Sequence, residues 1–211
     1  MNPIKHVVTG KARGAPGAAV PAFARFLGDR PEIVRCALHV AIEDAIGPNG
    51  EQTSDGVNLI AECWTVDHRS LDLIRMPLAD PAAYRVREVV EKGARGTAPG
   101  PAPGISVLAR LTAKPGMTVR EAVAGYDRHP LTALRVHFGM EYYIRNVTEV
   151  VETHGASPYF GFSLLHYACD EDRAEKHYDS PEGRQAIRDD IASFLDTAKL
   201  QVMEARSWLL R

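Results

Sequence analysis

The sequence has little of several features that would point directly to a function. No run of Lys or Arg offers a surface for nucleic acid or an anionic membrane, and the formal net charge is -2 with a pI near 6.4. No apolar run approaches the roughly 20 residues that span a bilayer. The start, MNPIKHVVTG, lacks the apolar segment of a signal peptide. These absences predict a cytoplasmic protein with no nucleic-acid or membrane partner.

Cysteine is scarce as well. Cys36, Cys63 and Cys169 are odd in number, scattered and without CxxC spacing, so we expect small buried side chains in a reducing compartment. No phosphate-binding loop, G-x-S-x-G elbow or H-E-x-x-H helix occurs. The sequence therefore predicts no metal site, no disulfide and no cofactor.

The chain that remains is an ordinary globular one of 211 residues, 45% hydrophobic and 25% charged. One segment, GARGTAPGPAPG at 93–104, is dominated by Gly, Pro and Ala and has no apolar period. It predicts a linker at 97–104 between two halves, 1–96 and 105–211.

The two halves match weakly at a constant offset of 103 positions. AAVPAFAR in the first half lies on EAVAGYDR in the second, HVAI lies on YYIR, and ECWTVD lies on LHYACD. At this offset, expected strands align with strands and helices with helices over nearly fifty residues, which indicates a tandem repeat with a degenerate first copy.

The second half predicts the clearer elements. Thr118 and Glu121 have capping-box spacing before a helix, and Ser180-Pro181 is typical of another helix start. Strands are expected where β-branched and aromatic residues gather. The expected order is strand 105–112, helix 119–127, strand 140–151, strand 158–168, helix 180–196 and strand 200–210.

In the first half, strands are expected at 4–9, 39–46 and 57–65. The stretch 84–92 is expected to be its last strand, with a helix as the alternative. The second half then follows the order β-α-β-β-α-β, the ferredoxin-like unit, and the first half repeats this order less clearly. The fold class is therefore α+β, with two fused ferredoxin-like repeats. Helices on one face of each sheet leave an apolar face to be covered.

The segments LTAKPGMTVREAVAGYDRHPL, YYIRNV, HYACDED and SPEGRQAIRDDIASFLD together resemble the EthD family of the dimeric α+β barrel superfamily. The resemblance covers about 104–211. It implies that the two antiparallel sheets face each other as an α+β barrel around a pocket. It also implies that His129, Tyr143 and Asn146 match the family's histidine, aromatic residue and asparagine, and that Asp190 and Phe194 match its late helix.

The predicted catalytic cluster is His129 as a proton shuttle and Asn146 as the group that holds a substrate oxygen. Tyr126 and Asp127 are expected to orient the imidazole or to donate to the substrate. We expect His129 and Asn146 to line one cavity. The alternative for His129 is a capping histidine at the surface. Strand alternation places Tyr142 on the face of Asn146 and Tyr143 on the opposite face.

The predicted substrate-binding residues are Tyr142, Tyr143, His166 and Trp64. For His166 and Trp64, ordinary core packing is the alternative. The resemblance implies a cofactor-independent enzyme that acts on a small apolar or aromatic molecule by acid/base chemistry, as an isomerase, dehydratase, cyclase or oxygenase. The alternative is a non-catalytic protein that binds such a molecule or haem. A homodimer is expected because open sheets leave edge strands.

Overall fold

The computed structural model describes residues 3–13, 18–42, 56–66, 71 and 75–211. The first half contributes β1 (Ile4–Ala12), α1 (Ala19–Gly28), β2 (Ile33–Ala41), β3 (Leu59–Thr65) and β4 (Leu78–Lys92). The second half contributes β5 (Gly100–Leu111), α2 (Val119–Arg128), α3 (Pro130–Val136), β6 (Tyr142–Val151), β7 (Gly161–Tyr167), α4 (Asp170–Glu175), α5 (Pro181–Ala192), the 3-10 turn η3 (Thr197–Lys199) and β8 (Gln201–Leu209).

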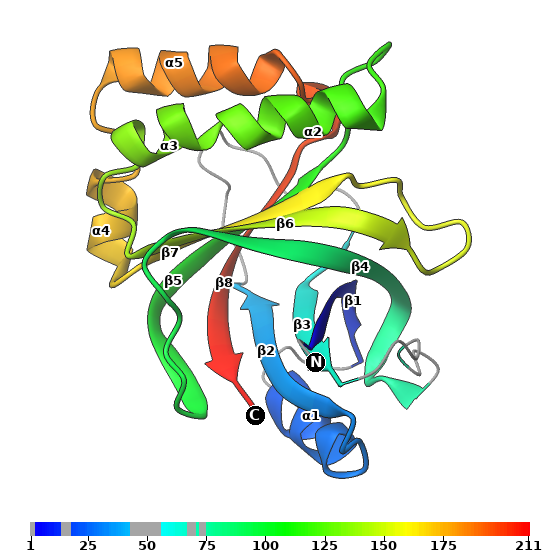
Figure 1. The fold of residues 1–211 in the computed structure, drawn as a ribbon. Helices are drawn as coiled ribbons and strands as arrows, with labels where there is room; N and C mark the ends of the chain where they lie inside the picture. The colour runs from blue at the N-terminus through cyan, green and yellow to red at the C-terminus, as the bar shows by residue number, and fades with distance from the viewer. Residues whose placement is uncertain (1–2, 14–17, 43–55, 67–70, 72–74) are drawn as a thin grey trace.

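The strands form one closed antiparallel barrel in the order β1-β3-β2-β8-β5-β7-β6-β4 (Figure 1). The first half supplies β4-β1-β3-β2 and the second half supplies β8-β5-β7-β6, which is the same order of first, second, third and fourth strands. The halves join at two seams, where β2 pairs with β8 and β4 pairs with β6. The predicted α+β barrel is confirmed.

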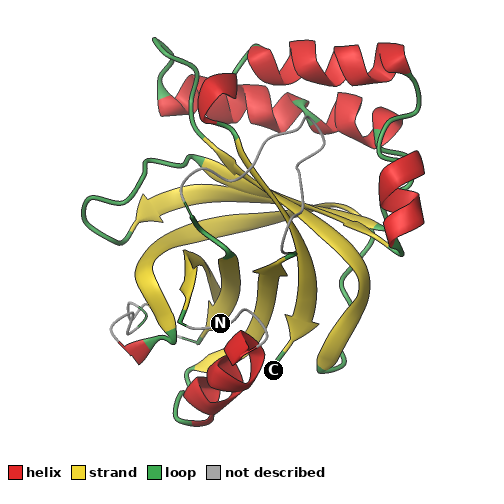
Figure 2. Ribbon diagram, turned by 180° about the vertical axis from the view of Figure 1, so that it is seen from behind, coloured by secondary structure: helices red, strands yellow, loops and turns green. Residues whose placement is uncertain are grey.

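Helices cover only the outside of the barrel (Figure 2). The amphipathic helix α1 packs Phe23 and Leu27 against Leu38 and Leu59 of the first-half strands. Helices α2, α3 and α5 cover the second-half strands, with Tyr126 and Phe194 among the buried aromatics there (Figure 1). Between β3 and β4 the described residues form no α-helix that corresponds to α5. No helix within the described part of the chain is long and apolar enough to cross a membrane.

Local sequence signals explain the helix starts. The capping box at α2 is present, since the Thr118 backbone N–H donates to Glu121 Oε2 at 2.8 Å and the Glu121 N–H donates to Thr118 Oγ1 at 3.3 Å. Ser180 caps α5 in the same way, accepting from the Gly183 N–H at 2.9 Å. Helix α3 was not predicted; Pro130 begins it, because proline suits the first position of a helix. The short helix α4 was not predicted.

Several strand limits differ from those expected. The stretch 84–92 is a strand, as predicted, within a longer β4. The strand β2 begins at Ile33 rather than at His39, and the predicted portion 43–46 lies outside the described residues. The segment 100–104, expected in the linker, belongs to β5. Division into the units 1–96 and 105–211 therefore stays a prediction, as does the tandem repeat.

A bulge in β5 gives the segment 100–104 its structural role. The register with β8 shifts between Ala102 and Ser106, and Gly104 lies there with φ +86°. A Cβ on Gly104 would lie 2.0 Å from the carbonyl oxygen of Tyr167, so only glycine fits. The bulge divides β5 into two parts that pair with β8, one at 100–102 and one at 106–110.

Two of the three cysteines lie close together although they are distant in sequence. Cys36 and Cys63 are paired residues of β2 and β3, both buried, with their Sγ atoms 3.9 Å apart. They are free thiols packed in the core under α1. The spacing along the chain gave no sign of this pairing.

A buried histidine pair connects the helical layer to the sheet. His137 Nδ1 donates to the carbonyl oxygen of His177, and the Tyr167 hydroxyl lies 2.6 Å from His177 Nδ1. The two imidazole rings are 4.4 Å apart. Burial lowers the pKa of His137 to about 4, and burial together with neighbouring His137 lowers the pKa of His177 further. Both rings are therefore neutral in the folded protein near pH 7.

This pair should make the fold sensitive to acid. In the unfolded chain each histidine titrates near pH 6.5, above its folded pKa, so the unfolded state binds more protons below that pH. Stability is complete above about pH 6.5 and falls by up to about 1.4 kcal/mol per pH unit for each such histidine below it. We expect chemical denaturation to show this loss between pH 7 and pH 5, and H137N to show a smaller loss. The exposed His154 provides the control H154N, and equal pH slopes for the two variants would contradict the prediction.

Candidate functional site

The barrel interior is apolar at its middle and polar toward one end. Side chains alternate along each strand, so Glu62 of β3 faces inward with its neighbour Ile60, which packs in the interior cluster with Val7, Ile144 and Leu164. On the same grounds Lys5 of β1 faces inward with Val7. The interior thus buries charged groups beside an apolar core.

Glu62 is the centre of this charged group, only 1% exposed. Its Oε1 lies 2.5 Å from Lys5 Nζ and accepts a hydrogen bond of 3.2 Å from Asn146 Nδ2. Its Oε2 lies 2.9 Å from His39 Nε2 and pairs with Arg95 Nη1. Four separate parts of the chain therefore supply partners to one carboxylate.

The charges of this group are mutually stabilised. Burial alone would raise the pKa of the Glu62 carboxyl, but Arg95, Lys5 and the His39 hydrogen bond hold its pKa well below the usual range. Burial lowers the pKa of Lys5, and Glu62 offsets only part of that effect. Burial also lowers the pKa of His39 despite the hydrogen bond to Glu62. The arrangement is an ionised carboxylate beside a neutral imidazole.

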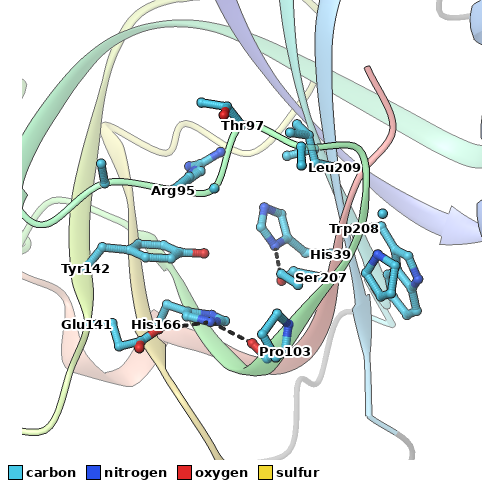
Figure 3. A pocket seen from close by; sticks show the side chains of 17 residues that line it. His39, Arg95, Thr97, Pro103, Glu141, Tyr142, His166, Ser207, Trp208 and Leu209 are labelled. Carbon is cyan, nitrogen blue, oxygen red and sulfur yellow. Dashed lines mark hydrogen bonds and ion pairs between the residues drawn. The ribbon is translucent and has the colours of Figure 1, made fainter.

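A pocket of about 450 Å³ opens at this end of the barrel. It lies between the ends of β8, β2 and β7, the start of β6 and the segment 94–103, whose small apolar residues form much of the wall. Figure 3 shows Tyr142 reaching in from one side, His39 and Ser207 from the other, and Arg95 above them. A volume of this size suits a small ligand with a few convergent polar groups.

A run of hydrogen bonds follows the pocket wall from strand to strand. His39 Nδ1 lies 2.7 Å from Ser207 Oγ, which lies 2.8 Å from Ser106 Oγ, which lies 2.9 Å from His166 Nδ1. We call His39, Ser207, Ser106 and His166 the imidazole–hydroxyl chain. Burial lowers the pKa of His166 to about 4. Tyr142 stacks on His166 with ring centroids 4.6 Å apart and planes at 8°, which gives the pocket a flat aromatic wall.

Three of the four predicted catalytic residues lie on the opposite side of the sheet. His129 is between α2 and α3, with its Nδ1 2.5 Å from Asp190 Oδ2 and its ring against Tyr143. Tyr126 donates to the Phe162 carbonyl oxygen at 3.2 Å, and Asp127 accepts from Arg145 at 2.8 Å. These contacts connect the helices to the outside of the barrel.

The expectation that His129 and Asn146 line one cavity is therefore wrong. Asn146 faces the interior, where it donates to Glu62, whereas His129 contacts Tyr143, which points to the outside of the same strand. The cavity beside His129 has about 80 Å³ and is lined mainly by apolar side chains such as Phe194 and Leu195. Family matching identified the residues of the helical layer, but it could not tell that the sheet separates them from the pocket.

The other predicted residues divide between the two faces. Tyr142 and His166 line the pocket, and Asn146 shares their face as alternation predicted. Tyr143 lies behind the sheet, also as alternation predicted. Trp64 lies against Lys5 and Arg95, with their cationic groups 4.6 Å and 5.4 Å from its ring centroid, and lines a separate hollow. The structure therefore brings together Tyr142, His166 and Asn146 but not the remainder.

The residues that sequence reasoning missed are those that make the site: Lys5, His39, Glu62, Arg95, Ser106 and Ser207. One signal was available. Glu62 is the lone charged residue in the apolar strand sequence LIAECWT, and Lys5 lies two positions before the apolar pair Val7-Val8. A charged residue on a buried strand is seldom tolerated without a partner. These residues are far apart in the sequence, so the sequence alone could not show which of them are partners.

The two histidines that line the pocket, His39 and His166, do not fit the haem-binding alternative. Haem iron needs an axial side chain with a free ligating atom. Both ring nitrogens of His39 are hydrogen-bonded, to Glu62 and Ser207, and those of His166 are bonded to Ser106 and the Pro103 carbonyl. The cavity at His129 is far below the roughly 300 Å³ of the smallest ligand pockets. Among the described residues, no three His, Cys, Asp or Glu side chains are grouped to hold a metal ion.

Comparisons with known proteins identify the fold but not a family. No family model matches the chain, so the resemblance to the EthD family stays a prediction. No curated protein matches it either.

Solved structures do match. An anthrone oxidase-like protein superposes with a TM-score of 0.64 at 9% identity, covering 100% of this chain and 92% of the other. A candidate monooxygenase from Fusobacterium nucleatum subsp. nucleatum gives a TM-score of 0.53 at 9% identity, covering 100% and 93%. A candidate chlorite dismutase gives 0.50 at 9% identity, covering 97% and 95%. These proteins share the dimeric α+β barrel fold, and at such identities the likeness shows the fold alone.

The charged group predicts a large and specific stability effect. Replacing Glu62 with Gln removes the carboxylate while leaving Lys5 and Arg95 buried, so we expect the free energy of unfolding to fall by about 3–5 kcal/mol. The control is E149Q, since Glu149 is half exposed and lies 3.8 Å from Arg85, where a loss below about 1 kcal/mol is expected. Urea denaturation of both variants at pH 7 decides the point. Equal losses would show that Glu62 is not the centre of the buried charge.

Proposed function

We propose that the protein is an oxygenase that acts on a small aromatic molecule through its acid/base residues, without a redox cofactor. The observation that carries this proposal is the ionised Glu62 backing a neutral His39 at the wall of a largely apolar pocket. A carboxylate bonded to one ring nitrogen fixes the tautomer and strengthens the imidazole as a base. The names of two structural neighbours, an anthrone oxidase-like protein and a candidate monooxygenase, agree with this chemistry.

Each pocket residue has a separate role in removing a proton from the substrate. His39 accepts the substrate proton through the Ser207 hydroxyl, which contacts His39 Nδ1 and lines the pocket. Arg95, buried beside Glu62, faces the negative charge that develops on the substrate oxygen. The stacked Tyr142 and His166 hold the flat face of an aromatic ring. Electrostatic stabilisation of this kind is strong because the site is largely shielded from water.

The reaction then balances with molecular oxygen alone. Deprotonation of a methylene group activated by aromatic rings gives a delocalised anion. That anion transfers an electron to O₂, and the resulting radical pair combines to a peroxide anion at the same carbon. The proton taken up by the base then returns to the peroxide and gives a hydroperoxide. Loss of water converts the hydroperoxide to a ketone, so that CH₂ and O₂ yield C=O and H₂O. Anthrone, which would become anthraquinone, is the natural probe for this class.

The homodimer is also a proposal, on different grounds from those expected. The described strands close into a barrel, so the edge strands that the sequence suggested are not exposed. Helix α3 and the residues just after it instead expose Leu131, Leu134 and Phe138, with Leu131 80% exposed. Apolar surface of this kind is typical of protein interfaces.

The proposed function predicts which histidine matters. We expect H39Q to lower the rate of oxygen uptake with anthrone by roughly 10²–10⁴-fold, the usual contribution of a general base. The matched control is H129Q, which alters a carboxylate-bonded histidine behind the sheet and should leave the rate nearly unchanged. An oxygen electrode and the absorbance of the quinone measure turnover, and circular dichroism confirms folding. If H129Q abolished turnover and H39Q did not, the base assigned here would be wrong.

A further inference from the structure

The imidazole–hydroxyl chain has fewer protons than hydrogen-bond contacts. It follows strands that are neighbours in the barrel, β2, β8, β5 and β7, and crosses the β2–β8 seam between the halves. His39 and Ser207 are directly paired residues, as are Ser106 and His166. Its three internal contacts, at 2.7, 2.8 and 2.9 Å, are all short enough to require a proton in each.

The outer contacts fix both tautomers. His39 Nε2 faces the Glu62 carboxylate and His166 Nε2 lies 2.9 Å from the carbonyl oxygen of Pro103. Both partners can only accept, so Nε2 carries the proton in each ring. Each Nδ1 is then an acceptor in the neutral imidazole. Burial keeps both rings neutral near pH 7, because it lowers the pKa of His39 and of His166.

The two serine hydroxyls cannot supply a proton to every contact of the imidazole–hydroxyl chain. Three contacts lie between the two Nδ1 acceptors, but Ser207 and Ser106 bring only one proton each. The Tyr142 hydroxyl also interacts with Ser106, but this adds one contact together with one proton and leaves the shortage unchanged. One internal contact is therefore left with facing lone pairs. A single added proton completes every contact by rotation of the two hydroxyls.

We propose that this chain is a proton relay with one vacant proton position, filled by the proton of a phenolic or enolic ligand that binds in the pocket as its anion. The inference rests on the proposed function, since His39 is the same base, and it extends that function to the substrate class. A proton received through Ser207 is shared with His166, so neither imidazole holds it alone. The ligand and the relay exchange one proton, and the complex gains no net charge.

The charges around the relay favour an anionic ligand oxygen. Arg95 lines the pocket with its side chain 8% exposed, and its Nε and Nη2 have no hydrogen-bond partner among the described residues. Lys5 and Glu62 complete the charged groups near His39, and the exposed Glu141 lies 3.9 Å from His166 Nε2. A buried guanidinium with free donors suits an oxyanion.

The experiment uses 4-nitrophenol, whose anion absorbs visible light and whose acid form does not, with the full chain and without oxygen. We expect the bound probe to ionise at a pH where the free probe is protonated, with its pKa lowered by roughly 1–3 units as beside an arginine. Calorimetry in buffers of different ionisation enthalpy should show that binding releases no proton to the buffer. Binding as the neutral phenol, release of the proton or absence of binding would each overturn the proposal.

Variants separate the relay from simple packing. S106A removes the hydroxyl that connects Ser207 to His166 in the imidazole–hydroxyl chain. The ionisation constant of the bound probe should then change by about tenfold toward that of the free probe, which is the effect of losing one hydrogen bond. S106T keeps the hydroxyl and should restore the shift. Ser163 is a buried serine of β7 that faces the helices, and S163A is the matched control. Equal shifts in S106A and S163A, with both variants folded, would overturn the relay.

This experiment fails separately from the proposed function. Proton capture is read from the probe's spectrum without oxygen, so it does not depend on turnover. A protein that captures the proton but consumes no oxygen with anthrone would retain the relay and lose the oxygenase assignment. A protein that oxidises anthrone but binds the probe as a neutral phenol would retain the oxygenase and lose the relay.

Discussion

The buried carboxylate of Glu62 is the constraint on which the rest of the site depends. An ionised carboxylate in a barrel interior is tolerated only if cations and hydrogen-bond donors surround it. Lys5, Arg95, His39 and Asn146 do so, and each comes from a different segment of the chain. Meeting this one requirement also fixes the tautomer of His39 and holds Arg95 over the pocket.

Closure of the barrel by a single chain explains why the site is complete. Each half supplies four strands in the same order, and the halves meet where β2 pairs with β8 and β4 pairs with β6. His39 of β2 is opposite Ser207 of β8, and Asn146 of β6 reaches Glu62 of β3. Neither half alone contains both the charged group and the hydroxyls. Folding of the two halves together is therefore what assembles the chemistry.

Local patterns predicted the fold better than the site. The capping box at Thr118, the cap at Ser180 and the alternation that separates Tyr142 from Tyr143 depend on near neighbours and were confirmed. His39 and Ser207 are 168 positions apart, so no local pattern could indicate their pairing. The Gly/Pro-rich run was predicted to be a linker because its own residues do not favour a strand. Its place in β5 depends instead on contacts of the bulge at Gly104 with β7 and β8. His129 was matched to a family position that lies outside the pocket in this chain.

Stability alone does not account for the charged interior. Well-packed apolar side chains in place of a buried ion pair often leave a protein as stable or more so. Ile60, Ile144 and Leu164 already belong to one apolar cluster in the barrel interior, so apolar side chains in place of the charged group would extend an existing core. What an apolar interior could not provide is a neutral imidazole with a fixed tautomer next to an ionised carboxylate and a guanidinium with free donors. The polar end of the barrel is thus best explained by proton transfer to and from a ligand, with the apolar middle supplying the stability.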